Sequence, residues 1–291
     1  MKKTVFAATL AALFTANVKA DTIGLYLGGQ IWQSEASGIF GEKNTLIDFN
    51  LKKEQQINYF VAVEHPFPLL PNVRISSTTL DTTGKTTLTQ EFSFGDETFA
   101  IGDNINASFN VSYIDYTLYY QLFNNDLFSF DLGLTARDFN GDVTVTGATI
   151  EENTQQGGNG WHESCFNEEG ELYGDCSPLP TSSSVTPTGK IKTDKIEPML
   201  YVATKISLPL TGLSVFGQGD FLLIDDHTIT DYQVGLSYDQ VGVSYNLFDS
   251  IIVDFNLALG YRVVKMEFED FDNLYSDLEF KGAFVGVTAH F

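Results

Sequence analysis

The sequence predicts an all-β protein: a single transmembrane antiparallel β-barrel of ten strands, occupying residues 21–291. Three observations support this prediction. Segments with period-two alternation recur along the chain and place apolar side chains on one face of each strand. The connections between these segments are either short or long, as in barrels that cross a bilayer. The chain also ends in an alternating strand with the C-terminal aromatic residue Phe291.

Residues 1–20 have the features of a secretory signal peptide. Lys2 and Lys3 make a basic start, residues 5–14 are almost wholly apolar, and Ala20 precedes the expected cleavage site. A membrane helix is the alternative, but such a helix needs roughly 20 apolar residues and this run has about half as many. No other segment has a long uninterrupted apolar run, so any membrane-spanning structure must be a barrel.

The expected strands follow one another with turn residues between them. They cover 22–32, 57–64, a weaker segment from 73, 114–121, 128–137, 200–208, 213–221, 232–238, 253–262 and 283–291. In the last strand one face suits lipid, because it is formed by Ala283, Val285, Val287, Ala289 and Phe291. A strand of this kind with a C-terminal aromatic carboxylate resembles the assembly signal of bacterial outer-membrane barrels.

The connections sort by length. Short ones are expected at 65–72, 123–126, 209–212 and 246–250, and long ones at roughly 33–50, 80–104 and 147–190. Short periplasmic turns and long extracellular loops are typical of outer-membrane barrels. A soluble β-sandwich is the alternative, but its outward positions would be polar, whereas here they are Leu, Val, Ile, Phe and Tyr in nearly every strand.

The composition excludes one class of partner. The chain has 16 Lys and Arg against 38 Asp and Glu, a net charge of -22. Binding to phosphate backbones requires clustered cations, so nucleic acid is not expected as a partner. The 24 Phe, 13 Tyr and 25 Gly against only 8 Pro favour strands and tight turns over helices.

A proline-rich turn, Glu64-His65-Pro66-Phe67-Pro68-Leu69-Leu70-Pro71-Asn72, is the most specific motif of the chain. Together with residues 115–120, 260–262 and His290-Phe291, it resembles a gammaproteobacterial outer-membrane β-barrel family of unassigned activity. The resemblance implies a location in the outer membrane of a Gram-negative bacterium. The expected partners are then outer-membrane lipid, lipopolysaccharide, periplasmic chaperones and the barrel assembly machinery, which would read Phe291.

Cys165 and Cys176 both lie in the expected loop 147–190. In an oxidising compartment such thiols normally pair, and the resulting disulfide should stabilise the protein by roughly 3 kcal/mol. A metal site with His162 is the alternative, but tetrahedral zinc needs a fourth ligand. We therefore expect a disulfide, with no metal and no cofactor.

Eight charged side chains are expected to point into the lumen: Glu64, Asp115, Asp131, Arg137, Lys205, Asp220, Asp254 and Arg262, with Arg137 near the outer end. Because a ten-stranded barrel is narrow, we expect them to form a paired plug. The alternative is a narrow polar conduit whose acidity would favour cations. The sequence thus predicts a structural scaffold or such a conduit, with an acidic extracellular surface.

One motif raises the question of catalysis. Asp225-Asp226-His227 resembles the Asp-x-His half of the active site in the omptin outer-membrane proteases. The resemblance implies that Asp225 would orient His227 to activate water. The opposite segment, 80–104, lacks the Asp-x-Asp spacing of that family, so we expect no enzyme and keep an endopeptidase as the alternative. Outer-loop acids are candidate ligands for divalent cations, although no EF-hand spacing is present: Glu168, Glu169, Glu267, Glu269, Asp270 and Asp272.

Overall fold

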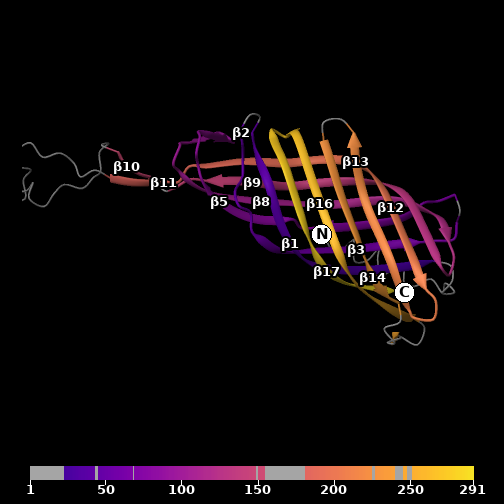
Figure 1. The fold of residues 1–291 in the computed structure, drawn as a ribbon. Coiled ribbons are helices and arrows are strands. Elements are labelled where there is room, and N and C mark those ends of the chain that lie inside the picture. The colour runs from indigo at the N-terminus through magenta and orange to yellow at the C-terminus, as the bar shows by residue number, and fades with distance from the viewer. Residues whose placement is uncertain are drawn as a thin grey trace, which may run out of the picture.

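The structure is a computed structural model that describes residues 23–42, 45–67, 69–148, 150–154, 181–224, 227–239, 245–247 and 251–291. Within these ranges ten strands form a closed antiparallel barrel, which confirms the predicted fold class (Figure 1). No helix in the described ranges is long and apolar enough to cross a membrane. The expected signal peptide and both cysteines lie outside the described residues.

Each barrel strand pairs with the next along the chain, and the last strand returns to the first. The ring consists of β1 (Gly24–Glu42), β3 (Lys53–Glu64), β4 (Asn72–Thr78), β8 (Asn104–Asn124), β9 (Phe128–Thr146), β12 (Thr188–Leu208), β13 (Leu213–Ile224), β14 (His227–Tyr238), β16 (Ile251–Phe271) and β17 (Leu274–His290). It closes where Leu27 of β1 pairs with Ala289 of β17. This register places the two chain-terminal strands side by side.

Shorter strands extend the ring at its ends. The strands β2 (Thr45–Ile47), β5 (Asp81–Thr87) and β15 (Tyr245–Leu247) pair with β1, β8 and β16, while β6 (Phe92–Phe94) with β7 (Glu97–Phe99) and β10 (Ile150–Thr154) with β11 (Thr181–Val185) form separate pairs. We call the end with connections 65–71, 125–127 and 209–212 the turn end, and the opposite end the loop end. The ribbon β10–β11 extends from the loop end (Figure 1).

Strand β8 shows that the barrel has two halves along its axis. Its side chains alternate regularly from Asn104 to Gln121, but the chemistry of the two faces reverses between Ser112 and Ile114. On the turn side of this boundary the outward residues are apolar, namely Ile114, Tyr116, Leu118, Tyr120 and Leu122, and on the loop side they are Asn104, Asn106, Ser108, Asn110 and Ser112. The inward face is polar on the turn side and apolar on the loop side, where Ile105, Ala107, Phe109 and Val111 are buried.

The same reversal occurs in other strands of the ring, such as β1 and β17. On the outward face it falls between Ile31 and Gln33 in β1 and between Lys281 and Ala283 in β17. An apolar band therefore surrounds the turn half of the barrel, as expected where strands contact acyl chains. Several strands continue beyond that band; β8, for example, extends for about 30 Å more at the usual rise of a strand.

The predicted loops 33–50 and 80–104 were therefore wrong in part. Strand β1 continues to Glu42, and residues 81–99 contain β5, β6 and β7. Segment 147–190 includes the strands β10 and β11 and the start of β12, and residues 246–247 belong to β15 rather than to a turn. The reason is chemical: beyond the apolar band the apolar side chains point inward, so a pattern of apolar outward residues covers only the part of each strand that lies in the band.

A hydrophobic core fills the loop half of the lumen, and we call it the outer core. Its largest fully buried members are Trp32, Phe40, Phe49, Phe92, Phe94, Phe99, Phe109, Tyr113, Phe139, Phe271 and Phe280. The rings contact one another directly; for example, the centroids of Phe40 and Phe49 are 4.5 Å apart. Aromatic pairs at such distances stabilise a core beyond their burial alone.

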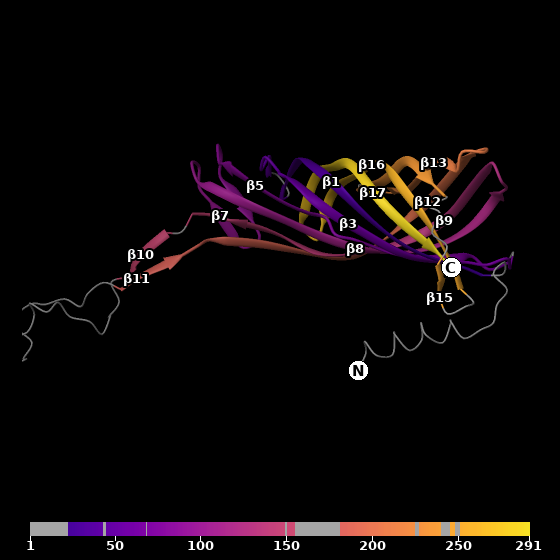
Figure 2. The same cartoon turned by 90° about the horizontal axis from the view of Figure 1, so that it is seen from below.

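The hairpin β6–β7 lies across the mouth of the barrel at the loop end. On one side the amide of Gly95 donates a hydrogen bond to Oε1 of Glu42, at the end of β1, over 2.8 Å. On the other side a Cβ at Gly189 of β12 would lie 1.9 Å from the carbonyl oxygen of Phe94. Since β1 and β12 lie halfway around the ring from each other, the hairpin spans the opening. Figure 2 shows β5 and β7 at the end from which β10 and β11 extend.

Candidate functional site

Next to the outer core, four buried charged side chains cross the lumen; we call Asp115, Arg137, Asp231 and Arg262 the ionic layer. Arg137 is fully buried, and its Nε and Nη2 donate to the two carboxylate oxygens of Asp115 over 2.7 and 2.9 Å. The same Nη2 donates to Oδ2 of Asp231 over 2.9 Å. Two-pronged arginine–carboxylate pairs of this kind are the strong form of charge-assisted hydrogen bond.

The second half of the layer is built around Asp231. Nε and Nη2 of Arg262 donate to its two oxygens over 2.9 and 2.8 Å, and the hydroxyl of Tyr113 donates to Oδ2 over 2.8 Å. Nη2 of Arg262 also reaches the hydroxyl of Tyr113 at 3.2 Å. Tyr113 is on β8 and Arg262 on β16, which lie on opposite sides of the ring, so the network joins opposite walls.

Register places these groups at one level. Asp115 pairs with Arg137 between β8 and β9, and Asp220 pairs with Asp231 between β13 and β14. Thr135 completes the wall by donating from its hydroxyl to Oδ1 of Asp220. The space left at this level is about 20 Å³, which is room for about one water molecule.

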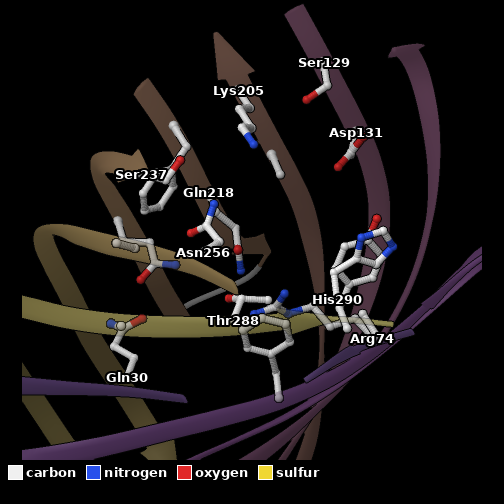
Figure 3. A pocket seen from close by; sticks show the side chains of 18 of the residues that line it. Gln30, Arg74, Ser129, Asp131, Lys205, Gln218, Ser237, Asn256, Thr288 and His290 are labelled. Carbon is white, nitrogen blue, oxygen red and sulfur yellow. The ribbon is translucent and has the colours of Figure 1, made fainter. Parts of the chain in front are cut away.

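The turn half of the lumen contains a cavity of about 620 Å³, which we call the turn-side chamber. Glu64 on its wall accepts hydrogen bonds from the hydroxyl of Tyr119 at 2.8 Å and from Nε2 of Gln121 at 3.0 Å. Nζ of Lys205 lies 2.8 Å from Oδ2 of Asp239. Figure 3 shows lining side chains that point into this cavity, including Lys205.

The structure divides the eight predicted lumen residues between two places. Asp115, Arg137 and Arg262 belong to the ionic layer and Asp220 lies beside it, whereas Glu64, Asp131, Lys205 and Asp254 line the turn-side chamber. The placement of Arg137 near the outer end was wrong: it lies mid-strand, because β9 continues to Thr146.

The sequence reasoning missed three functional side chains of the lumen. Asp231, which joins both arginines, lies two residues before Gln233 and therefore on the same inward face, so the alternation could have found it. Arg74 shares its face with Asn72 by the same rule, and it lines the chamber. Tyr113 carried no such signal, because it lies beyond the segment expected to be a strand.

His227 contacts the backbone of Glu269 and the ring of Phe271. Its Nδ1 accepts the backbone N–H of Glu269 at 3.2 Å, and its ring lies edge-on to Phe271 with centroids 5.7 Å apart. Asp225, its expected partner in the omptin-like alternative, lies outside the described residues.

In the part of the chain that the structure describes, no three or more His, Cys, Asp or Glu side chains are arranged to hold a metal ion. Glu168 and Glu169 lie outside that part, as do both cysteines of the expected disulfide. Glu267, within it, pairs instead with Lys265.

A closed antiparallel barrel with an apolar belt has the fold of the outer-membrane β-barrel proteins. Similar solved structures are the outer membrane protease OmpT from Escherichia coli, at 10% identity over 94% of this chain and 96% of that chain (TM-score 0.39), and Ail from Yersinia pestis, at 9% over 93% and 99% (TM-score 0.31). The toluene transporter TodX from Pseudomonas putida matches at 8% over 96% and 93% (TM-score 0.30). No protein-family model and no curated protein sequence matches the chain. These likenesses concern the fold and carry no argument about activity.

Proposed function

We propose that this protein is an outer-membrane scaffold whose barrel is closed. The apolar belt lies in the lipid of a Gram-negative outer membrane, the turn end faces the periplasm and the loop end faces outward, as short periplasmic turns require. The loop half then projects beyond the membrane as a packed β-structure. Its role is to anchor and hold that projecting structure rather than to pass solutes.

The observation that carries this proposal is the double closure of the lumen. A solute entering from the periplasm meets the ionic layer, which leaves about 20 Å³ of free space. Beyond it lies the outer core, whose Phe109 and Phe280 are fully buried. A cation conduit needs a continuous polar path with places where an ion can shed and regain water, and an aromatic core provides none.

Conductance measurements test the closed lumen. The refolded full-length barrel, inserted into planar bilayers, should show no steady single-channel conductance, because moving an ion through the outer core would require unpacking it. A general porin prepared in the same detergent is the control that shows the assay detects open barrels. Steady, reproducible steps from the protein would contradict the scaffold proposal and favour the cation-favouring conduit.

Membrane assembly forms part of the proposal. The N–H of Phe291 donates to the carbonyl of Leu25 over 2.9 Å, so the C-terminal residue prolongs the seam between β17 and β1. The assembly machinery would recognise this C-terminal strand at the seam. The proposed partners are therefore that machinery, periplasmic chaperones, outer-membrane lipid and lipopolysaccharide, with divalent cations as candidate ligands of the outer loops. We also propose that the protein belongs to the gammaproteobacterial outer-membrane β-barrel family that its proline-rich turn resembles.

The protein is proposed not to be an enzyme, and the hydrogen bond of His227 supports this. A neutral imidazole that accepts at Nδ1 carries its proton on Nε2. A His paired with an acid must donate from one nitrogen and keep the other free as a base. Because the Glu269 amide occupies Nδ1, His227 has no free basic nitrogen in this arrangement.

A cleavage assay tests this part of the proposal. The refolded barrel should not hydrolyse basic peptides above background, and His227→Ala should change nothing in that assay. Cleavage by the parent protein that falls by about 10²-fold or more in both Asp225→Asn and His227→Ala would establish the omptin-like alternative.

A further inference from the structure

The turn-side chamber has the size and access of a ligand site. Its volume of about 620 Å³ lies within the range typical of small-molecule pockets. Asn124, Asp254 and His290, at the turn ends of three strands, form part of its lining, so it opens toward that end. The ionic layer closes its other end. Molecules can therefore enter the chamber from the periplasmic side and cannot pass through it.

One wall of the chamber carries two carboxylates, Asp131 and Glu64, that make no ion pair within the described ranges. Asp131 pairs in register with Gln121, which in turn donates to Glu64, so the two carboxylates are neighbours. Among the described residues neither carboxylate makes an ion pair, because Lys205 is engaged with Asp239. Oδ1 of Asp131 is buried without a hydrogen-bond partner in the described part of the chain. A half-buried carboxylate in this state is destabilising unless a donor reaches it.

The chamber also carries a cation, Arg74, that makes no ion pair with any residue the structure describes. Arg74 projects from β4, and its guanidinium lies 3.5 Å from the centroid of the Phe60 ring. This stacking holds one face of the guanidinium and leaves its N–H edge available, the geometry that binds a carboxylate with two parallel hydrogen bonds. No ion pair within the described ranges involves Arg74, and Figure 3 shows it on the same cavity as Asp131.

From these features we propose that the turn-side chamber binds a small zwitterion, an amino acid or short peptide. The ligand carboxylate pairs with Arg74 and the ligand ammonium with Asp131. Aromatic side chains on the wall, among them Tyr26 and Tyr201, contact the ligand between its charged ends. Gln30 and Gln233 also line the chamber, and Nε2 of Gln30 and Oε1 of Gln233 are buried and unpartnered within the described residues. Rotation of these side chains would offer a donor and an acceptor to a peptide group of the ligand.

The pair of opposite charges decides the ligand class. A simple amine would place its ammonium in a chamber that already holds the free guanidinium of Arg74, and a simple anion would meet the carboxylates of Asp131 and Glu64. Only a molecule with both charges complements both walls. A metal ion is disfavoured because the described residues contain no group of three ligands arranged for one.

Isothermal titration of the refolded full-length barrel in detergent near neutral pH tests the proposal. The probe is L-alanyl-L-alanine, compared with its N-acetylated form, which lacks the ammonium, and its C-terminal amide, which lacks the carboxylate. We expect saturable binding of the dipeptide and binding weaker by about tenfold, or about 1.4 kcal/mol, for each blocked form. Absence of saturable binding, or equal affinities for the three probes, would overturn the proposal.

Two variants assign the ends of the ligand. Asp131→Asn should lower the affinity for the dipeptide by about tenfold and leave the affinity for the N-acetylated form unchanged. Arg74→Gln should also lower the affinity for the dipeptide by about tenfold, but it should leave the affinity for the amide form unchanged. Asp126→Asn, in the exposed turn between β8 and β9, is the control and should alter no affinity. Folding of each variant is checked by its gel mobility before and after heating. A folded variant that weakens all three probes equally, or none, would contradict the assignment.

Discussion

Replacing Arg137 by methionine should lower the free energy of unfolding by about 3 to 5 kcal/mol, since it leaves a buried carboxylate without its charge partner. Asp115 loses both of its hydrogen bonds from the guanidinium, and Asp231 loses one of its donors. Because the space at this level has room for about one water molecule, solvent cannot replace all of these donors. Urea unfolding of the protein in lipid vesicles, followed by tryptophan fluorescence, measures the effect.

Arg74→Met is the matched control, because Arg74 makes no ion pair among the described residues and stacks on Phe60. It should cost only about 0.5 to 1 kcal/mol, the contribution of an accessible cation–π contact. The double variant Arg137→Met with Asp115→Leu should recover much of the loss, since it removes the orphaned charge as well. Equal costs for Arg137→Met and Arg74→Met would show that the ionic layer does not stabilise the barrel.

An arginine at Leu118 should cost about 2 to 4 kcal/mol, the penalty for a cation on the lipid face near the middle of the bilayer. Leu118 lies at the centre of the apolar outward run of β8, and the residue is 52% exposed on the outer surface. Folding into vesicles over a urea gradient provides the measurement.

Asn110→Arg is the control, on the same outward face of the same strand but beyond the boundary at Ser112. Water surrounds this position in the proposed topology, so the change should stay within about 0.5 kcal/mol. If both arginines cost the same, the boundary between the lipid-facing and water-facing halves of β8 is misplaced.

The sequence alone determined the fold class, the expected position of the membrane belt and most inward-facing charges. The alternation of side chains is a local property of an extended backbone, so Leu118 and Asp115 could be assigned to opposite faces without any knowledge of the neighbouring strands. Local sequence also predicted the three short connections at 65–71, 125–127 and 209–212, because proline, asparagine and glycine determine turns by their own conformational limits. Barrel closure followed from the need to satisfy backbone hydrogen bonds in lipid.

Only the tertiary structure decided how far the strands continue and which inward side chains meet. The expected strand began at residue 114 rather than at Asn104, because the polar residues of this half of β8 point outward. Its inward apolar residues form a core only when the opposite walls of the barrel meet around Phe109. Asp231 meets Arg137 and Arg262 because closure and stagger of the ring bring β9, β14 and β16 to one level. Such contacts join residues far apart in the chain, and periodicity, which reports one strand at a time, carries no information about them.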